Sequence, residues 1–269
     1  MHAGTRLEES TRKAATAVLR PGRERRSFYV VMAATCVVVA LGGFAPTYWL
    51  QLTPGTFIGT PLLHLHAALF SAWLLYLLVQ TTMAARGHVA RHRALGLLGI
   101  SLATAMVFVG FAVANDVLVT RLAAGYGNAA RAFHIASISM ITLFGGFVFF
   151  AILYVSRPEI HKRLMLLATA AMLAPAIARM LFALNVGIGP GVRPGLGPPR
   201  TIESVLMPAL IADALIVAGA IYDMRTRGRP HPAYLVGGAI MLAVQVLRVP
   251  LSTTSWWFAI ADFLARFSG

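Results

Sequence analysis

The hydrophobic and polar positions fall into seven long apolar runs separated by short polar segments. A helix needs about 20 mainly apolar residues to cross the hydrocarbon core of a bilayer. This pattern predicts an all-α fold, a polytopic membrane protein built as a seven-transmembrane-helix bundle. The runs of sufficient length are Phe28–Leu50, Leu62–Met83, Ala94–Asn115, Ala132–Val155, Leu164–Asn185, Ser204–Asp223 and Ala233–Val249.

Composition favours the same class of protein. The 269 residues are 58% hydrophobic and 12% charged, whereas about 25% of the residues in a soluble domain are charged. The formal net charge of +14 does not point to nucleic acid, because the basic residues form short clusters between the apolar runs instead of one patch. We therefore expect a lipid bilayer as the partner and no nucleic acid.

The basic clusters lie on alternate connections. Cytoplasmic loops of membrane proteins are enriched in Lys and Arg, so the N-terminus of this multi-pass protein is predicted to be cytoplasmic and the C-terminus outside. The basic side carries clusters at residues 20–26, 86–93, 157–163 and 225–229, and the other side carries only Arg121, Arg131, Arg193 and Arg200.

Three segments follow from this layout: a basic cytoplasmic tail (1–27), the transmembrane bundle (28–250) and an outer amphipathic C-terminal segment (251–269). Within the last, Trp256–Phe267 is expected to lie on the membrane surface or to extend the seventh span. The loop Gly187–Arg200 holds five Gly and four Pro and cannot be helical. On the third span, small residues from Gly96 to Gly110 predict a close helix contact.

Two histidines open the second run. Pro61 suits the first turn of a helix, so His64 and His66 lie near its outer start. Residues two apart on a helix point about 200° apart, and His66 shares its face with Phe70 and Trp73. We therefore expect the side chain of His66 to face the bundle interior. His134 begins the fourth run at a similar depth.

Acidic side chains are expected at the same level. His64, His66 and His134, together with Asp116 or Glu203, offer a nitrogen and oxygen set that suits zinc or copper. Such a site requires an irregular start to the second helix. In the alternative, His64 faces lipid headgroups and His66 bonds a backbone carbonyl.

A second level of histidines lies at the inner boundary. His92 follows His66 by 26 residues, and His161 follows His134 by 27. The segments that begin at these residues, His92-Arg93-Ala94-Leu95 and His161-Lys162-Arg163-Leu164, are also alike, which predicts similar hairpins. These inner histidines either contact lipid phosphate, begin the next helix, or form a second pair.

Two charged residues fall inside predicted spans. Arg179 lies in the fifth run and Asp213 lies near the middle of the sixth. An unpaired charge at such a depth is costly. We therefore expect either an intramembrane ion pair between Arg179 and Asp213 or contact of each with a polar cavity.

Two resemblances add to these predictions. The strings Arg91–Gly96 and Glu159–Met165, with His66, Phe70, Trp73 and Gln80 before them, resemble a group of uncharacterised bacterial inner-membrane proteins. That resemblance covers spans two to seven and implies no established activity. The placement of histidines also resembles transmembrane di-haem b-type cytochromes, in which spans two and four hold one haem and spans three and five the other.

The second resemblance implies a haem b between His66 (or His64) and His134, and another between His92 and His161. This chain departs from the cytochromes in having seven spans instead of six and inner histidines at the interface. Three hypotheses stay open. They are electron transfer through haem with a quinone or other redox partner, a metal-dependent membrane hydrolase, and a transporter or scaffold without enzymatic activity.

Overall fold

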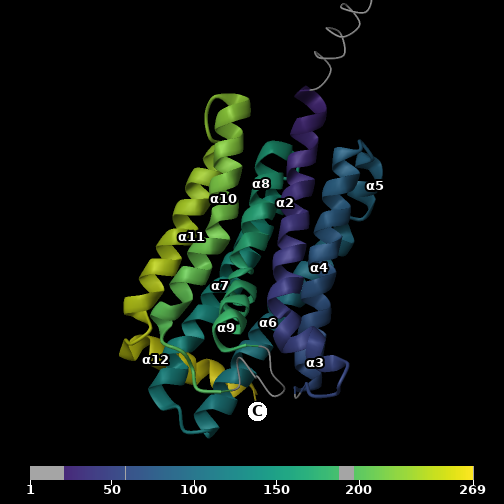
Figure 1. The fold of residues 1–269 in the computed structure, drawn as a ribbon. Helices are drawn as coiled ribbons and strands as arrows, with labels where there is room; N and C mark the ends of the chain where they lie inside the picture. The colour runs from purple at the N-terminus through teal and green to yellow at the C-terminus, as the bar shows by residue number, and fades with distance from the viewer. Residues whose placement is uncertain (1–20, 58, 188–196, 269) are drawn as a thin grey trace, which may run out of the picture.

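The computed structural model describes residues 21–57, 59–187 and 197–268. The predicted basic tail therefore lies mostly outside the described residues, as does much of the loop Gly187–Arg200. Within the described ranges the chain is helical and forms no strand (Figure 1). The elements are α2 (Pro21–Phe44), the π-helix η1 (Ala45–Trp49), α3 (Leu50–Leu52), α4 (Pro61–Ala85), α5 (Val89–Ala94), α6 (Gly96–Ala123), α7 (Gly127–Leu153), α8 (Pro158–Ala171), α9 (Ala174–Val186), the 3-10 helix η2 (Ile202–Val205), α10 (Leu206–Arg227), α11 (Pro232–Leu251), α12 (Ser255–Ala265) and the 3-10 helix η3 (Arg266–Ser268).

Seven of the helical segments among the described residues are long and apolar enough to cross a membrane. Each of the seven predicted runs coincides with one of them, so the prediction of a seven-helix architecture is confirmed at this level. The outward faces are strongly apolar, and Val38, Leu97 and Phe108 are each at least 71% exposed. Such faces are compatible with a lipid environment, because soluble proteins rarely expose large apolar patches.

Local sequence explains where several helices begin and end. Proline fixes φ and lacks an N–H, so it is well placed in the first turn, where no intrahelical partner is needed. Pro61, Pro158 and Pro232 occupy such positions in α4, α8 and α11. Gly228 ends α10 in the left-handed region, at φ 76°, which glycine adopts without a steric penalty.

The fifth span is central and broken. It is the most buried of the seven, at 56% of its apolar window, and its two halves α8 and α9 lie among the other helices in Figure 1. The break falls at Met172 and Leu173, just before Pro175, which cannot donate a backbone hydrogen bond to the preceding turn. The N–H groups of Met172 and Leu173 instead bond three residues back, which tightens the last turn of α8.

A compact core joins α4, α7 and α8. The indole Nε1 of Trp73 donates to the Thr169 hydroxyl across 3.1 Å, and the ring of Trp73 packs edge-on against Phe144 with centroids 5.1 Å apart. The expected small-residue face of the third span is also buried, since Gly99 faces Tyr76 and Gly110 faces Ile141. Small residues there let α6 approach both neighbours closely.

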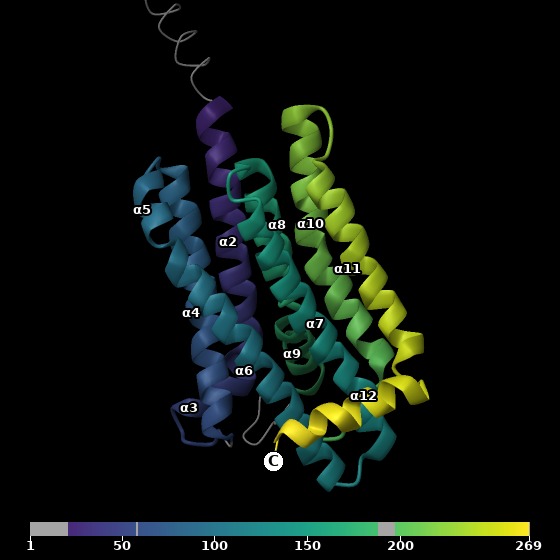
Figure 2. The same cartoon turned by 180° about the vertical axis from the view of Figure 1, so that it is seen from behind.

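The C-terminal segment is a separate helix and does not extend the seventh span. α11 ends at Leu251, and the Thr254 side chain caps α12 by accepting from the Trp257 N–H. Figure 2 shows α12 lying across the end of the bundle beside α6 and α7. Its residues Trp257 and Ala261 are buried, so α12 covers protein on one face.

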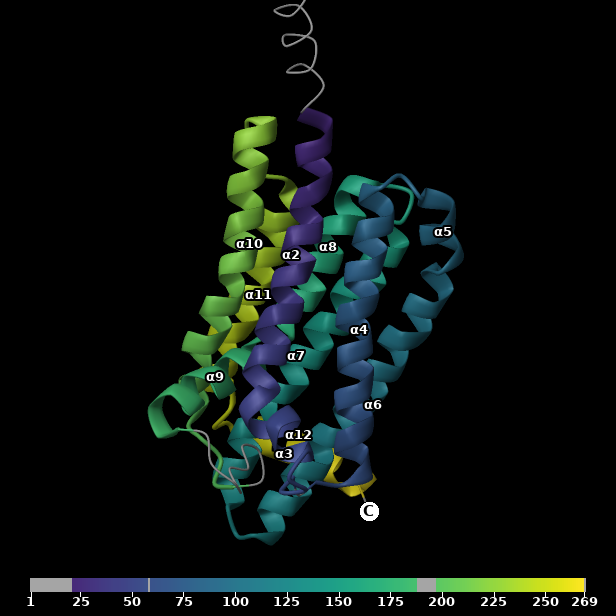
Figure 3. The same cartoon turned by 45° about the vertical axis from the view of Figure 1, so that its right-hand side comes forward.

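The bundle has two ends, which we name by the short helices there. The α5 end carries α5, the start of α8 and the α10–α11 connection. The α12 end carries α12, α3 and the end of α9 (Figure 3). The basic clusters at residues 86–93, 157–163 and 225–229 all belong to the α5 end.

The contact between α2 and α9 provides a test of this packing. A Cβ at Gly43 would lie 2.3 Å from the Ala176 carbonyl oxygen, whereas a Cβ at Gly42 meets nothing within 4 Å. We expect Gly43→Ala to destabilise the protein by about 1–3 kcal/mol, because a backbone atom cannot move aside. Gly42→Ala should be neutral or slightly stabilising.

Thermal unfolding of the two purified variants in detergent measures the difference. Equal melting temperatures for Gly42→Ala and Gly43→Ala would contradict the close approach of α2 to α9.

Candidate functional site

Two histidines from different elements meet at the α5 end. His92 lies on α5, and His161 lies in the first turn of α8, shortly after the helix-starting Pro158. Their ring centroids are 6.3 Å apart, with the ring planes at 85°. The short helix α5 folds back against α4 and so brings His92 beside a residue distant in sequence.

Each imidazole lies beside the backbone. The Nδ1–H of His161 donates to the Ala151 carbonyl oxygen across 2.8 Å, which leaves Nε2 of the neutral ring with a lone pair. The ring of His92 lies beside the backbone of Gln80, and its Nδ1 is buried without a hydrogen-bond partner. Both rings therefore keep one nitrogen free.

His92 is held in its neutral form. Burial lowers the pKa of His92 below its ordinary value near 6.5, and the neighbouring His161 acts in the same direction. A buried imidazole resists protonation because the charged form loses its hydration. At neutral pH this ring can accept a hydrogen bond or ligate a metal.

Two further polar side chains lie next to the pair. The Gln80 amide nitrogen donates to the Tyr76 hydroxyl across 2.8 Å, and that hydroxyl donates to the Leu95 carbonyl across 2.9 Å. The Gln80 Oε1 atom is buried and unpartnered. The cluster thus contains two buried acceptor atoms without a partner, His92 Nδ1 and Gln80 Oε1. Such atoms suit a metal centre or a ligand that donates hydrogen bonds.

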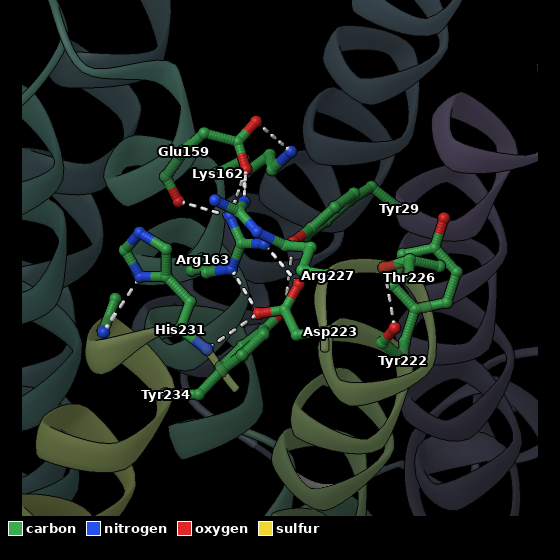
Figure 4. Close-up of polar contacts among 11 residues, drawn as sticks. Tyr29, Glu159, Lys162, Arg163, Tyr222, Asp223, Thr226, Arg227, His231 and Tyr234 are labelled. Carbon is green, nitrogen blue, oxygen red and sulfur yellow. Dashed lines mark hydrogen bonds and ion pairs between the residues drawn. The ribbon is translucent and has the colours of Figure 1, made fainter. Parts of the chain in front are cut away.

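A buried ion pair lies beside this cluster. The guanidinium of Arg163, two residues after His161, donates through Nε to Asp223 Oδ2 across 2.8 Å and through Nη2 to Asp223 Oδ1. Both side chains are at most 2% exposed. The bidentate geometry joins α8 to the end of α10, and Figure 4 shows the pair at the centre of the contacts.

Other charged groups complete the network around Arg163. Glu159 accepts from Arg163 Nη1 across 2.8 Å, from Lys162 across 2.7 Å and from the guanidinium of Arg227. The Tyr234 hydroxyl donates to Tyr29 across 3.4 Å, and both rings face the Arg163 guanidinium. Residues of α2, α8, α10 and α11 are thereby joined at one end of the bundle (Figure 4).

Sequence reasoning missed this network. Lys162 and Arg163 were assigned to a cytoplasmic basic cluster, and Asp223 only marked the end of a span. An acid next to Arg225 and Arg227, at the same boundary as Arg163, was the available signal. Its pairing depends on the neighbourhood of α8 and α10, which no local pattern encodes.

The predicted outer histidines have separate surroundings. His64 is exposed, and its Nδ1 pairs with the Tyr48 hydroxyl at 2.9 Å. His66 is half-buried against Phe70, at 4.0 Å between ring centroids, whereas His134 is buried beside Trp257 at 6.0 Å. Within the described ranges, no hydrogen bond or ring contact joins His66 to His134.

The structure does not assemble the expected metal-ligand set. Asp116 on α6 is half-buried, and Glu203 in η2 is exposed. Among the residues that the structure describes, no three His, Cys, Asp or Glu side chains gather so as to hold a metal ion. The combination of His64, His66, His134, Asp116 and Glu203 therefore has no geometric support.

The expected ion pair between Arg179 and Asp213 is replaced by other contacts. The Nη1 of Arg179 donates to the Pro175 carbonyl across 3.1 Å, and its guanidinium lies over the Phe44 ring at 4.6 Å. Asp213 accepts from the Gln245 amide across 3.2 Å and lies in the field of the buried Arg248. The two residues project from α9 and α10 toward different neighbours, so each finds its own partners.

Comparison of the chain with family models, with curated proteins and with solved structures found no match.

The buried ion pair generates a stability prediction. Asp223→Asn should destabilise the protein by about 3 kcal/mol, because it leaves a buried guanidinium without its bidentate partner. Arg227→Gln should cost no more than about 1 kcal/mol, because Arg227 and Glu159 are 38% and 48% exposed and water replaces their attraction. Unfolding in mixed micelles with increasing denaturing detergent measures both, and equal losses would contradict a central role for Asp223.

His231 generates a pH prediction. Its Nδ1 accepts from the Ala233 N–H across 3.1 Å and caps α11. Burial, followed by Arg163 and Arg227, lowers the pKa of His231 below its ordinary value near 6.5, although Asp223 and Glu159 oppose this shift. The unfolded chain therefore binds more protons, and stability should fall as the pH drops through 6.5.

The melting temperature of native protein and of His231→Asn, measured between pH 8 and pH 5, isolates this residue. The Asn amide oxygen can still cap the helix, so the variant should lose part of the pH dependence and keep its stability at pH 8. Identical pH profiles would exclude His231 as a titrating cap.

Proposed function

We propose that the protein is a membrane-embedded redox protein that binds a b-type haem through His92 and His161. The observation that carries this proposal is the pair of imidazoles on α5 and α8, with centroids 6.3 Å apart and the Nδ1–H of His161 held by the Ala151 carbonyl. A ligating histidine almost always donates its other N–H to such a partner. Two imidazoles complete the coordination of a haem iron.

The donor set favours haem over a zinc or copper site. Zinc in proteins takes four ligands, or three and a water, and the cluster at the α5 end offers two imidazoles and the orphaned Gln80 oxygen. The neutral state of His92 also fits, because a ligating imidazole must be unprotonated. When bound, haem b would supply one-electron chemistry, and the chain would hold it and set its potential.

The residues around the pair have defined roles in this proposal. The carbonyl of Ala151 orients the ring of His161, and the ring of His92 lies beside the backbone of Gln80. Arg93 on α5 lies within the electrostatic field of His92 and places positive charge beside the site. Nearby positive charge favours the electron-rich state of a redox centre, so Arg93 would raise its potential.

The distribution of charge sets the proposed orientation. The basic clusters gather at the α5 end, so the positive-inside rule places this end on the cytoplasmic side and the C-terminus outside. The protein would then lie in a bacterial inner membrane and exchange electrons with a quinone or another partner on the cytoplasmic side.

An absorption spectrum with metal analysis, on protein purified after haem-replete expression, tests the proposal. We expect a Soret band, and a loss of most bound haem in His92→Ala and in His161→Ala. His88→Ala is the matched control, because His88 lies one helical turn before His92, is exposed, and precedes α5 without a side-chain capping hydrogen bond.

Variants of the other histidines distinguish a haem at the α5 end from a haem at the α12 end. His66→Ala and His134→Ala should retain the band, and its loss in those variants would move the haem to the α12 end. Protein with neither haem nor stoichiometric metal would exclude the redox proposal altogether.

A further inference from the structure

Arg179 is half-buried, and its positive charge is paired with no carboxylate of the described residues. It lies on α9, after the break in the central span. Its contacts are the Pro175 carbonyl at 3.1 Å and the face of the Phe44 ring at 4.6 Å. Most of its N–H donors therefore remain available, although a guanidinium in an apolar region is costly to leave unpaired.

The end of the first span is shaped around this residue. Gly43 packs directly on the Ala176 backbone of α9, and the π-helix η1 begins two residues further, at Ala45. π-helical turns inside longer helices are frequent at functional sites. Thr47 lies one turn after Gly43 on the same face, and α2 and α9 run in parallel, so Thr47 reaches the level of Arg179.

Further polar atoms are orphaned on η1, which packs against α9, and on α4. The Thr47 hydroxyl, on a residue only 6% exposed, the Trp49 Nε1 and the His66 Nδ1 are all buried without a hydrogen-bond partner. His66 lies within the electrostatic field of Arg179. A buried polar atom without a partner is rare in proteins and calls for an unseen partner.

The unpaired atoms have a common chemistry. A guanidinium, a hydroxyl and an indole N–H all donate hydrogen bonds, and an imidazole can donate through its N–H. A cluster of donors with a net positive charge suits an oxyanion, above all phosphate, whose oxygens match the guanidinium fork. Apolar surface continues from the cluster, because Met180 and Leu184 of α9 are exposed.

We infer that Arg179, Thr47, Trp49 and His66 form a phosphate-binding site at the α12 end. The phosphate belongs either to the headgroup of an anionic lipid, whose acyl chains would lie along α9, or to free inorganic phosphate. The site is separate from the histidine pair at the α5 end and does not depend on the redox proposal.

Native mass spectrometry of the full chain in detergent tests this inference. The protein is titrated with phosphatidylglycerol, with phosphatidylcholine as the zwitterionic lipid, and with inorganic phosphate. We expect saturable binding of one phosphatidylglycerol or one phosphate, weakened on the order of tenfold or more in Arg179→Gln, because hydrogen bonds to a charged group are lost. Binding of phosphatidylglycerol alone identifies a lipid headgroup, and binding of inorganic phosphate as well identifies a free oxyanion.

Matched variants separate a built site from general attraction to positive charge. Arg200→Gln removes an exposed arginine at the same end, one that lies over Phe182 of α9, and should leave the affinity unchanged. Thr47→Val keeps the shape, removes one donor and should weaken binding even if Arg179→Gln does not fold.

Three results would overturn the inference. They are the absence of saturable binding of either probe, an equal loss of affinity in Arg200→Gln and Arg179→Gln, and full affinity in Thr47→Val when Arg179→Gln cannot be purified.

Discussion

A charged group that leaves water inside an apolar helix bundle must be neutralised by another part of the protein, because the surroundings solvate it poorly. Arg163 meets this constraint fully. Its guanidinium is held by Asp223 and Glu159 and faces the rings of Tyr29 and Tyr234. Four helices supply these groups, so the requirement of one arginine fixes how α2, α8, α10 and α11 meet at the α5 end.

The same constraint separates the two ends of the bundle. At the α5 end the buried charges of Arg163 and Asp223 are paired, and the orphaned atoms of His92 and Gln80 are acceptors. On η1, which packs against α9, the orphaned Thr47 hydroxyl and Trp49 Nε1 can donate, and Arg179 of α9 pairs with no carboxylate of the described residues. An acceptor cluster suits a metal centre, whereas a donor cluster suits an anion. The broken central span links the two regions, since α8 carries His161 and α9 carries Arg179.

Arg163 and Arg179 differ in their partners. Arg163 pairs with carboxylates, whereas Arg179 takes part in none of the ion pairs among the described residues. A satisfied pair contributes specificity of packing, and its removal leaves an uncompensated charge. An arginine without an ion pair, next to an exposed apolar helix face, is the ground for the proposed phosphate site. Both proposed sites, the redox site and the phosphate site, are therefore inferred from buried donors and acceptors that lack a hydrogen-bond partner.

The amino-acid sequence by itself determined the seven spans, since length and hydropathy are local properties, and it located the close contact of the third span through Gly99 and Gly110. It also predicted that His66 is more buried than His64, because helical phase is fixed by spacing. Only the tertiary structure decided the partners. It gave Arg179 and Asp213 different neighbours, left His66 and His134 unconnected, and brought His92 to His161 and Arg163 to Asp223. Those pairings depend on which helices, far apart in sequence, lie side by side, and on how α5 folds against α4. The hydrophobic periodicity within one span encodes neither of these.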